Sequence, residues 1–179
     1  MAKRSAKQIE QDKKRILDKL VKNSQMSAYQ IANNLGFSRQ KAWRFIKNLE
    51  EDETIWGYTA IINDNKLGLK RFNILLKLAP IGVTDKMLNI IINRELGEIA
   101  TKNKVNLESI YFLNGSYDGQ ISVTAENVIK VKKFISNLIK KLGVACFKEI
   151  NILEVLTPIQ MRGFNNPNLN QLKEYFSLD

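Results

Sequence analysis

Residues 37–49 contain the side chains whose types and spacing could do chemistry. Apolar residues recur there at i, i+3, i+4 and i+7, which predicts a helix with one buried face: Ala42, Phe45, Ile46 and Leu49. The other positions carry cations, an amide and an indole without any carboxylate: Arg39, Gln40, Lys41, Trp43, Arg44 and Lys47. A solvated helix face usually mixes charges of both signs. A face of one sign favours contact with a polyanion, and guanidinium and amide groups can also hydrogen-bond to base edges.

The preceding elements would position this helix as the second helix of a helix-turn-helix. Ser38 is a good N-cap for it, and Ser27 is a good N-cap for a shorter helix that ends near Gly36. Residues 9–23 form another amphipathic segment, and we expect residues 1–8 to be a disordered basic arm. Three short helices with a Gly-containing turn before the last are typical of helix-turn-helix DNA-binding domains. An ordinary three-helix fragment has the same outline.

We call the helix that follows Ser38 the recognition helix, and nine side chains in and before it are candidate DNA contacts. They are Ser27, Tyr29, Ser38, Arg39, Gln40, Lys41, Trp43, Arg44 and Lys47. Side chains at the start and on the outer face of such a helix meet base edges in the major groove. We expect Lys41 and Lys47 at phosphates instead, together with Lys3, Arg4 and Lys7 of the arm.

Two of these assignments have open alternatives, which are packing of Trp43 against a neighbouring helix and a merely solvated Lys47. Ser27 and Tyr29 stand at the start of the shorter helix, where free backbone N–H groups attract anions, so we expect them to contact phosphate.

The distribution of charge supports a nucleic-acid module at the N-terminus. The net charge is +10, and residues 1–49 hold twelve lysines and arginines against three acids, Glu10, Asp12 and Asp18. That segment therefore carries +9 and the remainder of the chain +1. A generally basic protein would spread this charge, so the asymmetry favours a polyanion partner, although basic patches also bind anionic lipid.

The composition excludes several classes of chemistry. The sequence has no histidine, which removes His-based acid–base catalysis and imidazole metal ligands. Its one cysteine, Cys146, cannot form an intramolecular disulfide and fits a reducing cytoplasm. No window approaches the roughly 20 apolar residues of a membrane span, and the basic N-terminus is followed by no apolar run. We expect a cytoplasmic protein without cofactor, metal or membrane partner.

The rest of the chain predicts an α+β fold. An acidic run at 50–53 is followed by an aromatic and β-branched strand, Thr54 to Ile62, that must pair with something, most simply with a symmetry mate. The later segments alternate as βαββαβ, the ferredoxin-like arrangement. The expected domains are 1–62 for the winged-type helix-turn-helix and its linker strand, 63–68 for a linker, 69–157 for the ferredoxin-like domain and 158–179 for a C-terminal extension.

With these elements in place, the chain resembles the Lrp/AsnC family of leucine-responsive, feast/famine transcriptional regulators over roughly residues 9–157. Residues 35–38 match the family at the helix-turn-helix turn. Residues 55–61, Ile-Trp-Gly-Tyr-Thr-Ala-Ile, are similar to the family's Ile-x-Gly-Tyr-Thr-Ala strand. Residues 115–118, Gly-Ser-Tyr-Asp, stand at the place of its Gly-x-Tyr/Phe-Asp turn. The order and spacing of these motifs carry the resemblance.

The resemblance implies a DNA-binding regulator that dimerises sheet to sheet, with linker strands associated across the two-fold axis. Such dimers often assemble further into tetramers or octamers, and an amino acid often binds near the Gly-x-Tyr-Asp turn. The implied effector residues are Gly115, Tyr117 and Asp118. From the residues alone, Asp118 could equally cap backbone N–H groups of a plain hairpin turn.

Two other functions stay open. An architectural protein that coats DNA with little base preference would carry the same basic N-terminal segment. Some haem-biosynthetic decarboxylases resemble the same two-domain layout, but their chemistry leans on histidine, which this chain lacks.

Overall fold

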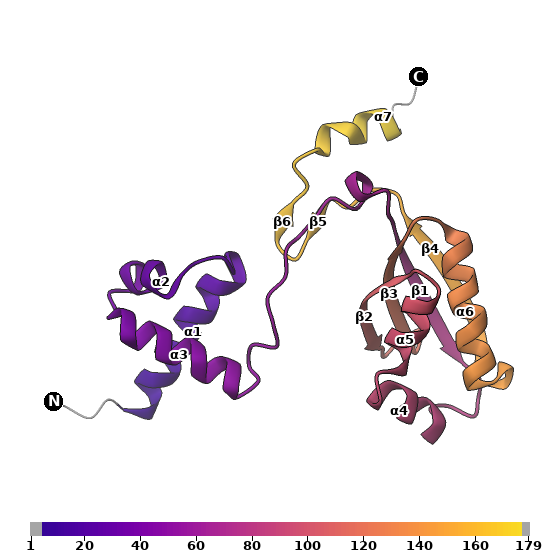
Figure 1. Cartoon of the computed structure of the whole chain (residues 1–179), viewed down its shortest axis with the longest axis horizontal. Coiled ribbons are helices and arrows are strands. Elements are labelled where there is room, and N and C mark those ends of the chain that lie inside the picture. The colour runs from indigo at the N-terminus through magenta and orange to yellow at the C-terminus, as the bar shows by residue number, and fades with distance from the viewer. Residues whose placement is uncertain (1–4, 177–179) are drawn as a thin grey trace. The chain divides into compact units, whose positions relative to one another are not determined.

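The structure, a computed structural model, describes residues 5–176, apart from the side chains of residues 171, 174 and 175. The chain divides into two compact units (Figure 1). The first runs to Ile61 and includes residues 162–164, and the second begins at Ile62. Lys3 and Arg4 of the expected basic arm lie outside the described residues.

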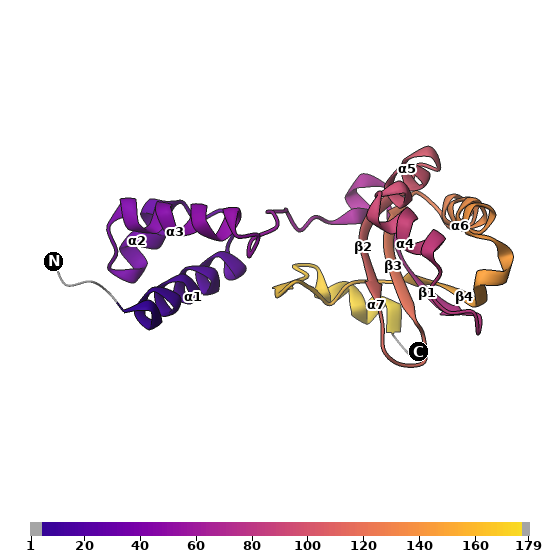
Figure 2. The ribbon, with the colours of Figure 1, turned by 90° about the horizontal axis from the view of Figure 1, so that it is seen from below.

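The first unit is a bundle of three helices, α1 (Ala6–Lys22), α2 (Ala28–Leu35) and α3 (Arg39–Glu51) (Figure 2). Their shared core is apolar and consists of Ile16, Leu20, Ile31, Ala32, Ala42, Phe45 and Leu49. This core confirms the buried face expected for the recognition helix, which is α3, although Ile46 is only partly buried.

Each helix of this unit begins at a serine whose hydroxyl accepts a backbone N–H, as the N-cap preference predicts. Ser5 caps α1, so this helix starts earlier than expected and Lys7 is helical rather than part of a disordered arm. Gly36 ends α2 in the left-handed conformation, with φ of 68°, and thereby makes the turn into α3.

The strand expected at residues 54–62 is absent from the single chain. The Ile55 N–H still donates to the carbonyl of Leu49 at the end of α3. Within the described structure, none of the backbone N–H groups of residues 56–62 donates to another backbone group. These residues run without regular structure into a short 3-10 helix, η1 (Asp64–Leu67), because a strand requires a hydrogen-bonded neighbour. We call residues 55–62 the linker; the segment expected as a linker, residues 63–68, contains η1.

The second unit is an antiparallel sheet backed by helices. Its strands stand in the order β2-β3-β1-β4, which is the ferredoxin-like order. They are β1 (Lys70–Leu78), β2 (Asn106–Phe112), β3 (Gly119–Ala125) and β4 (Phe147–Val155). The helices α4 (Asp85–Ile92), α5 (Glu95–Lys102) and α6 (Val128–Leu142) cover one face (Figure 2). A short 3-10 helix, η2 (Val144–Cys146), leads into β4.

The βαββαβ order is confirmed, with one difference. The helix expected from Asp85 to Glu95 or beyond is two helices, α4 and α5, because Arg94 adopts a left-handed conformation with φ of 58° and interrupts the helical path. In β1, Phe72, Ile74 and Leu76 point into the core beneath the helices, whereas the residues between them lie on the other face of the sheet.

The C-terminal extension has structure of its own. A two-stranded hairpin, β5 (Gln160–Met161) and β6 (Phe164–Asn165), precedes a 3-10 turn, η3 (Leu169–Gln171), and a short helix, α7 (Leu172–Phe176). The Asn166 side chain donates to the carbonyl of Pro158 at 2.8 Å and closes the base of the hairpin.

Candidate nucleic-acid interface

The outer face of α3 is exposed along its first two turns. A wide, open hollow there is lined by Ser38, Arg39, Gln40, Lys41, Trp43 and Arg44. The side chains of Arg39, Gln40 and Arg44 are exposed, and 58% of Trp43 is exposed. The structure therefore brings the expected base-contacting residues together on one face without a carboxylate among them, which suits hydrogen bonding to an acceptor-rich groove.

Lys41 requires a correction, because its ammonium group lies inside the domain. Only 9% of Lys41 is exposed, and its Nζ lies 2.5 Å from Oδ2 of Asp12 on α1, which is 2% exposed. The same Nζ lies 3.5 Å from the centre of the Phe37 ring, a cation–π contact. The structure therefore pairs the Lys41 ammonium group within the domain, where it holds the start of α3 on α1, instead of presenting it to a phosphate.

Asp12 was not among the predicted site residues, although the sequence contains a signal for it. It occupies the same helical stripe as Ile16 and Leu20, four and eight residues on, so its carboxylate had to be buried with a partner. Gln8 donates to its Oδ1 at 3.2 Å, and an Arg15 nitrogen lies 3.9 Å away. We call Asp12, Lys41, Phe37 and Arg15 the anchor cluster.

Lys47 is exposed but interacts within its own domain. Its Nζ lies 3.3 Å from Oε2 of Glu50, and Oε1 of Glu50 accepts the Tyr58 hydroxyl at 3.0 Å. Burial and the neighbouring Glu50 carboxylate raise the pKa of Tyr58 above its usual value. Trp43 borders a second hollow, between α3 and the turn from α1 to α2, so both interpretations of this indole stay open.

The start of α2 keeps its polar groups in a capping box. Ser27 accepts the Gln30 N–H at 3.2 Å, while the Ser27 N–H donates to the Gln30 side chain at 2.8 Å. Ser38 likewise accepts the Lys41 N–H at 3.2 Å. Both serine hydroxyls still have a proton to donate. Tyr29 stands 58% exposed beside Ser27, so this end of α2 is open to an anion.

The three expected effector residues lie at and after the β2–β3 turn. The Asp118 carboxylate accepts the Leu78 N–H of β1 at 2.8 Å, and the Tyr117 hydroxyl accepts from the Asn151 side chain of β4 at 2.9 Å. Gly115 lies in the turn itself. Asp118 thus binds a backbone N–H, but one from another strand rather than from its own turn. It also borders a small apolar cavity of about 50 Å³ between the sheet and its helices, which neither Gly115 nor Tyr117 lines.

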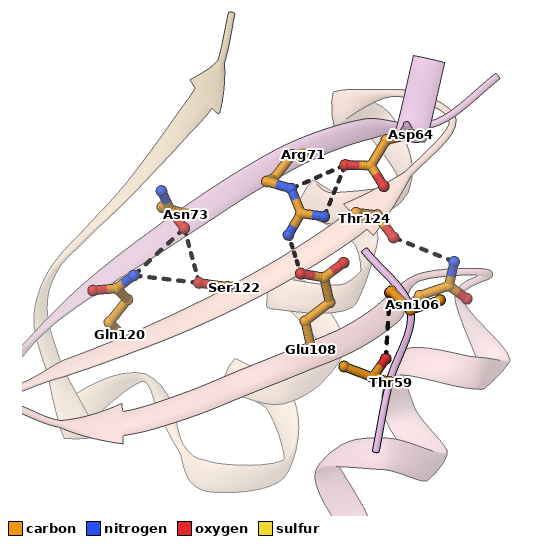
Figure 3. A network of polar contacts seen from close by, with 10 residues as sticks. Thr59, Asp64, Arg71, Asn73, Asn106, Glu108, Gln120, Ser122 and Thr124 are labelled. Atoms are coloured by element: carbon orange, nitrogen blue, oxygen red, sulfur yellow. Dashed lines mark hydrogen bonds and ion pairs between the residues drawn. The ribbon is translucent and has the colours of Figure 1, made fainter. Parts of the chain in front are cut away.

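The sheet face opposite the helices carries a polar network (Figure 3). Arg71 donates to Asp64 at 2.9 Å and also pairs with Glu108. Burial alone would lower the pKa of Arg71, but the hydrogen bonds that its guanidinium donates to the two carboxylates outweigh burial, and the pKa lies above its usual value. Asn73 accepts from Ser122 at 2.8 Å. The polar side chains of this network hydrogen-bond to one another, and the helices α4, α5 and α6 lie on the other face of the sheet.

The described residues contain no group of three or more His, Cys, Asp or Glu side chains placed to hold a metal ion. Over the same part of the chain, no helix is both long and apolar enough to cross a membrane.

Comparison with known proteins agrees with this geometry. The family model described as winged helix-turn-helix DNA-binding matches residues 13–55. An uncharacterized HTH-type transcriptional regulator of Pyrococcus abyssi is 27% identical over 143 residues, which cover 80% of this chain and 90% of that protein.

Two solved structures show the same fold over most of the chain. An AsnC family transcriptional regulator from Agrobacterium tumefaciens superposes with a TM-score of 0.61 at 18% identity and covers 90% of this chain and 97% of that one. A transcriptional regulator from Neisseria meningitidis in complex with L-Met gives the same four values. The predicted resemblance is thus confirmed in the fold: the chain has the architecture of the Lrp/AsnC transcriptional regulators, with a winged helix-turn-helix DNA-binding domain at its N-terminus.

Proposed function

We propose that this chain is a sequence-specific, DNA-binding transcriptional regulator that works as a homodimer and responds to an amino acid or a related small metabolite. The observation that carries the proposal is the acid-free, exposed start of α3, held on a three-helix core by the anchor cluster. A face built of guanidinium, amide and indole groups on a fixed helix suits the major groove.

The proposed contacts divide into two kinds. Arg39, Gln40 and Arg44 face base edges, since Arg pairs bidentately with guanine and Gln with adenine. Ser27 and Tyr29 at the start of α2 donate to phosphates, where the helix dipole adds to the attraction. Ser38 and Lys47 extend the phosphate contacts, and Trp43 contributes apolar contact. Lys41 takes no part in DNA contact.

A homodimer follows from the size of the module and from the unpaired linker. One helix-turn-helix covers only a few base pairs, so two half-sites about 34–36 Å apart are needed for an operator. The linker leaves the N–H groups of residues 56–62 without backbone partners in the described chain, and a symmetry mate would supply them. The polar sheet face suits pairing with a second sheet. Tetramers or octamers remain an implication of the resemblance.

The amino-acid effector rests on two supports, the L-Met complex of the Neisseria regulator and the position of Gly115, Tyr117 and Asp118 at one turn. Asp118 has further acceptor capacity for an ammonium group. Titration of L-methionine against the melting temperature tests it, because a ligand that binds the folded state raises that temperature. No shift with any of the twenty amino acids would remove the effector from the proposal.

We propose no enzymatic activity, since the relatives are described as regulators and the chain lacks histidine. A DNA-coating architectural protein is the second candidate, favoured by the charge of +9 on residues 1–49. A regulator of this kind would act in the cytoplasm.

Substitution of Arg44 tests base contact directly. Binding sites are selected from random duplexes with the wild type, with Arg44→Ala and with Lys133→Ala, which removes an exposed cation from α6. Arg44→Ala should lose base preference at one position per half-site, at a cost of about 1–3 kcal/mol, while Lys133→Ala keeps the wild-type motif. Identical motifs from all three proteins would refute the base contact.

A further inference from the structure

Trp56 in the linker is the most exposed large apolar side chain of the described chain, with 95% of its surface in water. An indole is among the largest apolar surfaces a protein can bury, and tryptophan is enriched at protein interfaces for this reason. Within the described structure, none of the backbone N–H groups of residues 56–62 donates to another backbone group. Both the side chain and the backbone of this segment are therefore incomplete in a single copy.

A hollow in the same unit has the size and chemistry to hold an indole. We call it the indole pocket, and it is lined by Leu20, Ser24, Met26, Ala28, Trp43, Ile46, Lys47, Glu50 and Tyr58. Its volume is about 270 Å³. For scale, an engineered apolar cavity of about 150 Å³ binds benzene.

The polar groups of the pocket also match an indole. Glu50 offers a carboxylate to the ring N–H, Lys47 offers an ammonium group to the ring face, and Trp43 and Tyr58 offer aromatic neighbours.

The spacing of residues in the linker connects the indole to the pocket. Trp56 and Tyr58 are two residues apart, so in an extended strand they lie on the same face, with Gly57 between them. If two linkers pair antiparallel with Gly57 at the two-fold axis, Trp56 of one copy lies directly opposite Tyr58 of the other. A Cβ built on Gly57 would have no atom within 4 Å, so the close approach is open. Tyr58 lines the pocket, which puts the opposite indole at its mouth.

Given the linker pairing of the proposed homodimer, centred on Gly57, we propose that each Trp56 enters the indole pocket of the partner subunit. The occupant is thus a second copy, and the pocket is filled only in the dimer. This inference rests on the proposed homodimer. It adds a coupling, because the indole contacts the same α3 that presents Arg39, Gln40 and Arg44. Assembly would fix the spacing of the two recognition helices.

Fluorescence of a single indole tests the proposal. The chain has two tryptophans, so Trp43→Phe leaves Trp56 as the one reporter and keeps an aromatic wall in the pocket. At micromolar concentration its emission should be shifted to the blue, and dilution below the dimer dissociation constant should shift it to that of an exposed indole. Emission of an exposed indole from a sample that is dimeric by light scattering overturns the inference but spares the dimer. A monomer at every concentration overturns both.

Cross-linking provides a second, independent measurement. In a Cys146→Ser background, one tagged copy carries Trp56→Cys and a differently tagged copy carries Met26→Cys. Oxidation should join the two copies, whereas Val21→Cys in place of Met26→Cys should give no cross-link, since Val21 is 74% exposed and does not line the pocket. Equal cross-linking of both pairs would overturn the docking.

Dimer affinity gives the energetic counterpart. Trp56→Ala should weaken the dimer roughly tenfold or more, as expected for a buried interface tryptophan. Val21→Ala should leave the dissociation constant unchanged.

Discussion

Lys41→Met separates the stability of the N-terminal unit from its contact with DNA. The change removes the ammonium group of the anchor cluster and keeps an apolar side chain of similar length. Asp12 would then lie 2% exposed without the cation that is 2.5 Å from its Oδ2. Breaking a buried pair by removing one partner costs about 3–5 kcal/mol, because a buried charge is left uncompensated.

The remaining partners of Asp12 place the effect at the lower end of that range. Gln8 still donates to Oδ1 at 3.2 Å, and Arg15 stays 3.9 Å away. We therefore expect Lys41→Met to lower the free energy of unfolding of the N-terminal unit by about 3 kcal/mol. Asp12→Leu combined with Lys41→Met removes both charges and should recover most of the loss.

Urea denaturation followed by tryptophan fluorescence measures this effect in the full chain. Both tryptophans, Trp43 and Trp56, belong to the N-terminal unit, so the signal reports its unfolding and not that of the ferredoxin-like domain. The midpoint should fall for the single substitution and return for the double one. An unchanged midpoint would refute the structural role of the pair.

Lys41→Met should leave the salt dependence of DNA binding unchanged. Under conditions where both proteins are folded, the slope of log affinity against log salt should be the same for wild type and Lys41→Met. Lys47→Met, the matched control on the exposed face of α3, should reduce that slope by about 1. A reduced slope for Lys41→Met would show that Lys41 contacts phosphate after all.

Further predictions concern the turn, the end of α3 and the sheet. Gly36→Ala should cost about 1 kcal/mol in urea denaturation, because φ is 68° while no atom crowds the new methyl group. Hydrogen bonds from Thr54 and Lys13 lower the pKa of Asp52 below 3.8. The ionised Asp52 carboxylate therefore stabilises the folded state fully above that pH, and this contribution is lost as the pH falls through the folded-state pKa. The stability of Asp52→Asn should therefore depend less on pH in acid than that of the wild type. An unchanged midpoint of acid unfolding would count against this role of Asp52. Arg71→Met should lower the thermal stability of the sheet domain by leaving two carboxylates unpaired, with calorimetry as the measurement.

Local patterns in the sequence predicted the elements and the exposed face of α3. Serine caps and the i, i+3, i+4, i+7 spacing depend on residues within one helix, so Ser27, Ser38 and Phe45 could be assigned from the sequence alone. In β1 the buried and less buried residues alternate, because one face of the sheet is buried beneath helices.

Features that depend on distant partners could not be predicted in the same way. Lys41 looked like a surface cation because its partner, Asp12, stands 29 residues away in the sequence. The linker was predicted to be a strand because its residue pattern is that of a strand. The structure has no strand there, because the described part of the single chain offers it no neighbour to pair with. The break between α4 and α5 could not be predicted, because it occurs at Arg94 and not at a Pro or Gly.

Selection of bound duplexes from a random pool at about 150 mM salt tests the central claim most directly, because phosphate contacts alone give no sequence preference. A dimeric regulator predicts a palindromic motif with half-sites one helical turn, about 10–10.5 base pairs, or a multiple of it apart. No motif, together with affinity for unselected DNA that falls steeply as salt rises, would contradict the account and favour an architectural protein that coats DNA.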